Sequence, residues 1–335
     1  MNLTYDKQKY EKRQKDILVL IAKALQVKQE EISGLTSIKK GMTNHSFLFE
    51  CEGKKYMIRV PGEGTDRLIN RRAEAEVYQI IRDRGIGDNC LYIDPHNGYK
   101  ITEYLEPSRV CNPEDMEDVS KCMKVLRRFH EMNLYTNHEF SIFQQIDFYE
   151  SLWGSRKSQH SDYAERKKRV FSLKNYMDAH AGHKVLTHID AVPDNFLFHK
   201  EEAGQEDIYL IDWEYAGMQD PHVDIAMFGI YAGYTKRQMD DLIGLYFEGE
   251  CQEEVRIKIY CYVAACGLLW SNWCEYKQSL GVHFDAYASR QYQYAGDYYA
   301  IVSEALGKEK ETWVFCRQCS DYGGRTVQPS GAAFL

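Results

Sequence analysis

The stretch VLTHIDAVPDNFLF, residues 185–198, places a histidine, two aspartates, a proline and an asparagine between two apolar runs. Such runs are typical of buried strands, where carboxylates are rarely found unless they are paired. The polar residues follow the spacing His-x-Asp-x-x-x-x-Asn over residues 188–195, and a second apolar stretch, YLIDWEYAG (209–217), contains Asp212. We therefore expect a polar site where two buried strands end.

Phosphoryl transfer requires a set of side chains of this kind. Asp190 would orient the attacking hydroxyl and accept its proton, while Asn195 and Asp212 would hold a magnesium ion that bridges nucleotide phosphates. The alternative is a loop whose aspartate and asparagine only cap turns. The spacing occurs by chance in roughly one chain in a hundred of this length. The flanking apolar runs and the nearby LIDWEY favour the catalytic interpretation.

Two upstream segments supply further candidates. KKGMTNHSFLF (39–49) puts Gly41 and the pair Thr43-Asn44 at a turn between strands, where backbone amides could line phosphates; an ordinary hairpin turn has the same composition. YMIRV places Arg59 among apolar neighbours, a costly position unless it meets phosphate or carboxylate.

A helix is expected after Arg59, and it carries two possible carboxylate partners. Glu74 and Glu76 both lie on it, and each taken alone is also typical of a solvated helix face. The sequence leaves the choice between them open.

The expected elements separate a small sheet-rich part from a larger helical part. SFLFECEG and KKYMIRV predict a hairpin, and two more strands should surround the turn at 94–98. After a short connection at 101–106, helices predominate, with the strands of 185–212 among them. The expected helices are residues 5–26, 67–85 (ended by Gly85), 115–132, 253–280 and 298–306.

Composition limits the classes of protein to consider. With 335 residues, 44% hydrophobic and 27% charged, the chain has the composition of a globular protein, and its net charge of -8 argues against nucleic-acid binding. Ten scattered cysteines do not suggest a disulfide framework, and CRQC (316–319) lacks a second pair for a metal site. No segment is apolar enough over sufficient length to span a membrane, so we expect a cytoplasmic protein.

Several motifs taken together resemble the choline/ethanolamine kinases, within the aminoglycoside-phosphotransferase branch of the protein-kinase-like fold. They are KGMTN, IRVPGEGT, INRRAE, ITEYLEPSR, HIDAVPDN, IDWEYAG followed by DIA, and LLWSNW. The resemblance implies an α+β fold: a small antiparallel-sheet lobe that binds the nucleotide (1–100, with a leading helix), a hinge (101–106) and a helical lobe with the catalytic and substrate site (107–335). It also implies ATP as co-substrate, Mg²⁺ as cofactor and a small-molecule acceptor; a homodimer stays open.

The resemblance assigns roles to individual residues. It implies a phosphate loop at Gly41, Met42, Thr43 and Asn44, a phosphate-binding strand position at Arg59 with Glu74 as its partner, and an adenine hinge at Glu103, Tyr104 and Leu105. It implies Asp190 as catalytic base and Asn195 and Asp212 as magnesium ligands. Two features depart from the family: Lys40 stands where relatives often have glycine, and about the last twenty residues resemble nothing in it.

The acceptor depends on LLWSNWCEYKQSLGVHFDAYASRQYQY (268–294), where Trp270 and Trp273 share a helical face. A trimethylammonium group cannot donate hydrogen bonds, so aromatic faces must recognise it. Spacing alone is more typical of a core tryptophan pair. The resemblance instead implies that Trp270, Trp273 and Tyr287 bind choline.

Three functional hypotheses follow. The first is a kinase that makes phosphocholine from choline and ATP. The second is a kinase for ethanolamine, thiamine or an aminoglycoside, whose pocket would have acidic rather than aromatic lining. The third is a non-catalytic binding protein with a kinase fold, and the joint presence of Arg59, Asp190, Asn195 and Asp212 weighs against it.

Overall fold

The computed structural model describes residues 2–38, 44–62, 65–200 and 206–307, with side chains from residue 14 onward. The chain forms two compact units. Unit 1 comprises the residues up to 139 together with 185–218, and unit 2 comprises residues 140–184 and those from 219 onward. The predicted hinge at 101–106 lies within unit 1, and the division into a nucleotide lobe and a substrate lobe stays a prediction.

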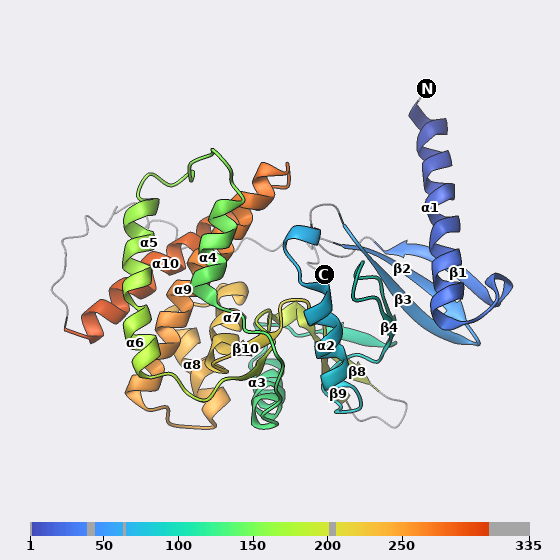
Figure 1. Ribbon diagram of the computed structural model, residues 1–335. Coiled ribbons are helices and arrows are strands. Elements are labelled where there is room, and N and C mark those ends of the chain that lie inside the picture. Colours follow the sequence, from blue (N-terminus) through green and yellow to red (C-terminus); the bar gives the residue numbers. More distant parts are fainter. Residues whose placement is uncertain (1, 39–43, 63–64, 201–205, 308–335) are drawn as a thin grey trace. The chain divides into compact units, whose positions relative to one another are not determined.

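Unit 1 contains a five-stranded antiparallel sheet in the order β1-β2-β3-β5-β4 (Figure 1). The predicted hairpin is confirmed, with β2 and β3 paired from Asn44↔Pro61 to Cys51↔Lys54. The sheet and its helices are β1 (Ile32–Ile38), β2 (Asn44–Cys51), β3 (Lys54–Pro61), β4 (Cys90–Ile93), β5 (Lys100–Glu103), α1 (Asn2–Leu25) and α2 (Arg71–Ile81). Ile17 and Ile21 of α1 belong to the same buried core as Phe49 of the sheet.

Helix α2 is shorter than the predicted 67–85. The side chain of Asn70 accepts a hydrogen bond from Ala73 N (3.2 Å) and caps the start of the helix. The preceding residues Thr65–Arg67 form a separate 3₁₀ turn. Gly85, with φ of +65°, lies four residues beyond the last helical residue. The predicted end at Gly85 was therefore wrong: Arg82 already has a non-helical backbone (φ -53°, ψ 137°), and Asp83 is left-handed with φ of +59°.

The remaining elements of unit 1 frame the segment quoted at the outset. Residues 188–195 connect β7, which pairs with β10, to β8, which lies in the sheet β6-β8-β9. The loop ends in the 3₁₀ turn Pro193–Asn195. The elements are β6 (Ser108–Val110), β7 (Val185–Thr187), β8 (Phe196–Lys200), β9 (Glu206–Leu210), β10 (Gly217–Gln219), α3 (Met116–Glu131) and the 3₁₀ turn Gln29–Glu31.

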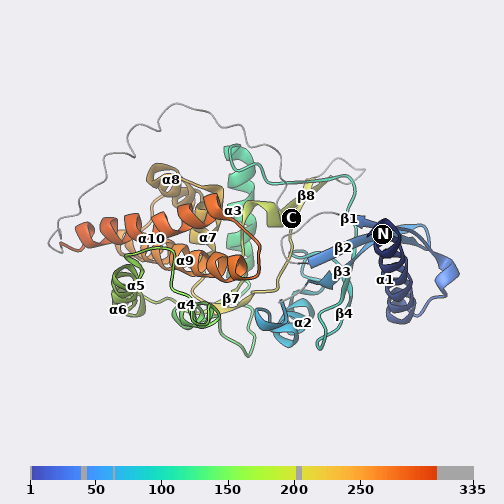
Figure 2. The same ribbon diagram turned by 90° about the horizontal axis from the view of Figure 1, so that it is seen from above.

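Unit 2 is helical, and its longest helix, α9, is buried along most of its length. Helix α10 lies alongside α9 (Figure 2). A side chain at Gly267 would come within 2.7 Å of Gln291 O, so glycine permits this close approach. The predicted helix at 298–306 is only the last part of α10. The helices are α4 (Ile142–Ser151), α5 (Tyr163–Ser172), α6 (Lys174–Ala179), α7 (His222–Ala232), α8 (Lys236–Phe247), α9 (Glu253–Ser279) and α10 (Asp285–Ala305).

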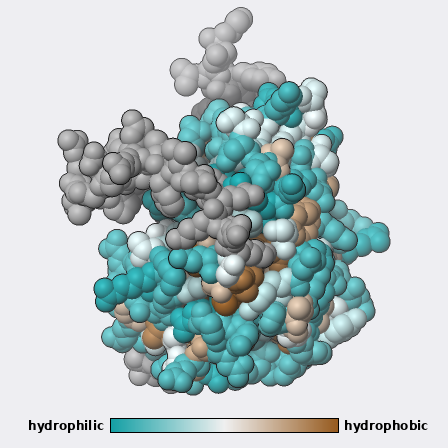
Figure 3. Space-filling view, turned by 90° about the vertical axis from the view of Figure 1, so that its left-hand side faces the viewer, coloured by the Kyte–Doolittle hydropathy of each residue, from teal (hydrophilic) through white to brown (hydrophobic). Residues whose placement is uncertain are grey.

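Two predictions made from composition can be checked in the described residues. None of their helices is long and apolar enough to cross a membrane. The face drawn in Figure 3 is mostly hydrophilic, with small hydrophobic patches. The eight cysteines in the described part of the chain are all free thiols. Cys316 and Cys319 lie outside the described residues.

Candidate active site

A cluster of charged side chains in unit 1, all but one of them buried, surrounds Arg59. This charged cluster consists of Arg59 on β3, Arg71 and Glu74 on α2, and Asp212 and Glu214, which follow β9. Arg59 Nη2 lies 2.5 Å from Glu74 Oε1, and its Nη1 lies 3.2 Å from both Asp212 Oδ1 and Glu214 Oε2. One guanidinium therefore joins three carboxylates from two parts of the sequence.

Burial and charge act against each other in this cluster. Burial by itself would lower the pKa of Arg59, but the three carboxylates outweigh it and raise the pKa. Desolvation opposes the ionised form of Asp212, yet Lys100 and Arg59 lower its pKa below the usual range. Burial, together with the Asp212 carboxylate, raises the pKa of Glu214 to about 7. Of Asp212 and Glu214, Asp212 is thus the one held in its ionised form.

The structure separates the two candidate partners of Arg59. Glu74 is 1% exposed and makes the contact. Glu76 accepts hydrogen bonds from the backbone and side chain of Asn137 at 3.2 and 3.3 Å. Because residues two apart on a helix point in nearly opposite directions, only one of them can face Arg59.

The loop at 188–195 is held rigidly beside Asp212. Asn195 Nδ2 donates to the backbone oxygen of Asp190 at 2.8 Å and lies 3.3 Å from its Oδ2. Ile211 N donates to Asn195 O at 2.9 Å, and Ile211 O is 2.9 Å from His188 Nε2. These bonds place the residue before Asp212 directly against the loop.

Two residues of this region have left-handed backbone conformations. Ile189 has φ of +68° and Asp212 has φ of +66°. A β-branched residue in this region costs roughly 1–3 kcal/mol and persists only where surrounding contacts enforce it. Ile189 immediately precedes Asp190, so the surrounding contacts enforce a strained backbone next to this carboxylate, whereas aspartate tolerates the left-handed conformation at 212.

The other predicted nucleotide residues lie partly outside the described residues. Gly41, Met42 and Thr43 are among those the structure does not describe. Asn44 begins β2, and its Nδ2 lies 3.4 Å from Glu214 Oε2. The phosphate loop therefore stays a prediction, although its last residue reaches the charged cluster.

The predicted adenine hinge follows β5. Glu103 N donates to Asn89 O, and Tyr104 N donates to Lys55 O, both at 3.0 Å. Leu105 N has no acceptor among the described residues, while Leu105 O accepts from Ser108 Oγ at 2.8 Å. One backbone donor of the predicted hinge thus has no acceptor within the described residues.

In unit 2, three rings form an aromatic group: Trp270 and Trp273 on α9, and Phe284 just before α10. The ring centroids of Trp270 and Trp273 are 5.9 Å apart, and Phe284 stacks on Trp273 at 5.5 Å. Lys277 Nζ lies 5.2 Å from the centroid of Trp273. Tyr287 is half-buried, with its ring 6.0 Å from that of Tyr231.

Trp273 differs from the other tryptophans of the described chain in its polar atom. The indole N–H groups of Trp153, Trp213 and Trp270 donate to Asn272 O, Leu210 O and Met227 Sδ respectively. Trp273 is 2% exposed, and its Nε1 is buried with no acceptor among the described residues. A core tryptophan normally pairs this group. Burial fits the core interpretation, whereas the unpaired N–H leaves one donor for an oxygen atom of a ligand.

Sequence reasoning missed four residues that the structure adds to these groups. Glu214 follows Asp212 by two positions, and Arg71 precedes Glu74 by three, a spacing at which helical side chains meet. That spacing could have identified Arg71. Phe284 and Tyr231 carry no comparable signal, because their partners Trp273 and Tyr287 lie on other elements.

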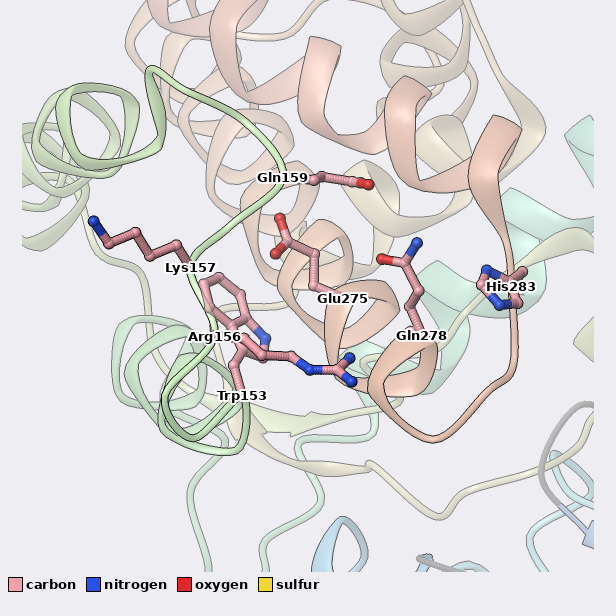
Figure 4. Close-up of a pocket in the computed structure, with 7 residues that line it drawn as sticks. All are labelled: Trp153, Arg156, Lys157, Gln159, Glu275, Gln278 and His283. Atoms are coloured by element: carbon pink, nitrogen blue, oxygen red, sulfur yellow. The ribbon is translucent and has the colours of Figure 1, made fainter.

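A hollow of about 570 Å³ in unit 2 lies beside α9 (Figure 4). Glu275 and Gln278 of α9 line one side, and residues of the α4–α5 connection line the other. Ser158 Oγ donates to Glu275 at 2.5 Å, and burial raises the pKa of this carboxyl. None of the predicted site residues lines the hollow.

The residues of unit 1 fit a magnesium ion. Carboxylate oxygens of Glu74, Asp212 and Glu214 lie within 4.8 Å of one another. Both oxygens of Glu74 are bound by arginines, whereas the side chain of Asp212 is 37% exposed. Asn195 uses its Nδ2 on Asp190, which leaves its amide oxygen as a ligand atom. Hard oxygen donors of this kind suit Mg²⁺, and Asp212 and Asn195 are the two that would hold it.

This chain is similar to known proteins in both sequence and structure. The family described as choline/ethanolamine kinase matches residues 35–240. Protein LicA of Haemophilus influenzae is 27% identical over 265 residues, which are 75% of this chain and 76% of that protein. The crystal structure of choline kinase LicA from Streptococcus pneumoniae has a TM-score of 0.74 at 28% identity and covers 86% of this chain and 99% of its own. A structure of LicA in complex with AMP has a TM-score of 0.72 at 27% identity, with coverage of 86% and 98%.

Proposed function

Because this chain belongs to the choline/ethanolamine kinase family, we propose that it transfers the terminal phosphate of ATP to the hydroxyl of choline, giving phosphocholine. The expected α+β fold and the family resemblance are confirmed. The acceptor, the metal ion and the role of each residue are the parts that we propose.

The charged cluster supports the nucleotide half of this reaction. Arg59 and Asn44 each carry a buried polar atom, Nε and Oδ1, with no partner among the described residues. Buried polar atoms in proteins are nearly always paired, so these two favour a missing polar ligand. Arg59 would donate to phosphate oxygens, and Leu105 N would donate to the adenine ring. A relative binds AMP, which fits this assignment.

The loop at 188–195 supports the transfer step. Asp190 is half-exposed, and its backbone is fixed by Asn195, so its carboxylate can accept the proton of an acceptor hydroxyl while holding it in line. A magnesium ion held by Asp212 and Asn195 would neutralise charge on the phosphate oxygens. The firmly ionised Asp212 suits that role, since a protonated carboxyl binds metal poorly.

The aromatic group is the observation that carries choline as the acceptor. Lys277 Nζ lies 5.2 Å from the centroid of the Trp273 ring, and the ammonium of choline would take the place of this lysine. The indole N–H of Trp273 has no acceptor among the described residues, and only the hydroxyl oxygen of choline, not its ammonium, could accept from it. Each aromatic face contributes roughly 0.5–2 kcal/mol toward a quaternary ammonium, and neighbouring rings add to this.

A panel of acceptors tests the proposal. ATP consumption would be measured with choline, ethanolamine, thiamine and an aminoglycoside at matched concentrations. We expect choline to give the highest kcat/KM, because its methyl groups bury apolar surface against the rings whereas a primary ammonium must lose more hydration. A higher kcat/KM with ethanolamine or an aminoglycoside would reject choline as the acceptor while leaving the kinase assignment intact.

A further inference from the structure

Arg71, the first residue of α2, connects three parts of unit 1 through one buried guanidinium. Its Nη1 lies 3.0 Å from Glu74 Oε2 and 3.4 Å from Glu214 Oε2. Its Nη2 donates to Thr65 Oγ1 at 3.1 Å, and Thr65 belongs to the connection between β3 and α2. The residue is 8% exposed, so these contacts form with little water nearby.

The fold reserves space for this side chain. Gly98, at the turn between β4 and β5, has φ of +74°. A Cβ atom at this position would stand 2.5 Å from both Cδ and Nε of Arg71. Any other residue at 98 would be strained in its backbone and would also displace the arginine. Arg71 can therefore keep its position on α2 only if residue 98 in the turn is glycine.

Arg71 complements Arg59 rather than duplicating it. Glu74 gives Oε1 to Arg59 and Oε2 to Arg71, so the two guanidinium groups hold the carboxylate from both oxygens. Glu214 Oε2 forms an ion pair with both arginines, at 3.2 Å from Arg59 Nη1 and 3.4 Å from Arg71 Nη1. If Arg59 turns its Nη1 toward a phosphate, Glu214 still keeps one cation.

We propose that Arg71 is a positioning residue for ATP: it holds Glu74 and Glu214 in place so that Arg59 can exchange a carboxylate for a phosphate. The inference rests on the nucleotide half of the proposed function and is independent of the acceptor. Without Arg71, Glu214 would have no cation beside it whenever Arg59 moved, whereas Glu74 would keep Lys100 at 3.9 Å. A buried carboxylate without a cation is strongly unfavourable. Arg59 would then stay with the carboxylates, and ATP would bind weakly.

The experiment compares Arg71→Met with Arg109→Met in the full chain. Arg109 is a matched control, because it also joins two carboxylates of unit 1, Asp118 and Glu206, but it is 48% exposed and outside the charged cluster. The affinity for Mg·ATP would be measured by calorimetry without acceptor, and thermal melting would be recorded for each variant. We expect R71M to bind Mg·ATP at least tenfold more weakly and R109M to bind it within twofold of wild type.

Two further variants separate positioning from folding. Arg71→Lys keeps the charge but has a single nitrogen, so it cannot hold two carboxylates and Thr65 in one geometry; we expect partial loss of affinity. Adding Glu214→Gln to R71M removes the uncompensated charge and should restore part of the lost affinity.

Each outcome has a clear meaning. Normal Mg·ATP affinity in R71M overturns the inference alone. If R71M does not fold, R71K decides, and wild-type affinity in R71K overturns the inference. Absence of Mg·ATP binding by the wild-type chain would reject the proposed function as well.

Discussion

The two units each bury charged groups, but they do so in different ways. In unit 2, Lys258 Nζ lies 2.7 Å from Asp220 Oδ2, and both side chains are 2% exposed. The same carboxylate accepts from the backbone N–H groups of Gly182 and His222. In unit 1, the carboxylate of Asp212 is 37% exposed, and Arg59 retains a buried Nε with no partner among the described residues.

This difference distinguishes an ion pair that only stabilises the fold from a charged cluster that can bind a ligand. The pair in unit 2 is closed, because the protein itself supplies partners to both oxygens of Asp220. The charged cluster is open on the side of Asp212, and its arginine keeps an unused donor. Both groups are costly to desolvate. Only the open one can exchange a protein contact for a ligand, so we expect its variants to change catalysis and those of the closed pair to change stability.

The largest effect is expected for Asp190→Asn. The amide keeps the size of the side chain but cannot accept the hydroxyl proton, so turnover should fall by roughly 10²–10⁴-fold. Mg·ATP affinity and thermal melting should stay close to wild type. Asp194→Asn, in the same loop, is the control and should keep most of the activity. Turnover within tenfold of wild type in the Asp190 variant would remove its assignment as base.

Lys258→Met tests the closed pair. Removing the lysine leaves Asp220 buried without its cation, which should cost about 3–5 kcal/mol in the free energy of unfolding. Urea denaturation would measure this loss, and kinetic constants of the folded variant should stay within about twofold of wild type. Lys174→Met removes an exposed pair with Asp178 and should cost about 1 kcal/mol or less. A large loss of ATP affinity in folded K258M would contradict the conclusion that the Lys258–Asp220 pair is only structural.

Asp212→Ala tests the charged cluster of unit 1 by removing one of its carboxylates, and we expect it to change ligand binding more than stability. Loss of the proposed ligand should weaken Mg·ATP binding by roughly ten- to a hundredfold and shift the magnesium requirement of the reaction upward. Stability should change little, because the side chain is partly exposed and Arg59 keeps two other carboxylates. An unaltered magnesium titration would exclude Asp212 as a ligand.

Trp273→Leu gives the smallest expected effect. It tests whether unit 2, whose buried ion pair is structural, also contributes a residue that binds the acceptor. Leucine keeps apolar bulk but removes the ring face, so the KM for choline should rise about tenfold while the KM for ATP stays unchanged. Trp153→Leu is the control, because its N–H is paired within the fold. If both variants only melt at lower temperature, Trp273 is a core residue.

The sequence by itself determined the loop at 188–195 and the two strands that flank it. Asp190 and Asn195 lie within one short segment whose apolar flanks form β7 and β8, so local spacing was enough to bring them together. The hairpin that carries Arg59 was equally readable, because alternation and a turn lie in adjacent residues. In these cases the information is contained in neighbours along the chain.

Only the tertiary structure decided which charges meet and which stay open. Glu74 was selected over Glu76 by the way α2 faces β3, and Glu214 joined the cluster from more than a hundred residues away. Lys258 and Asp220, 38 residues apart, carry no local signal of their pairing. The unpaired N–H of Trp273 is likewise invisible in the sequence. Burial and the supply of partners depend on every element packed around a side chain, and spacing along one element cannot report them.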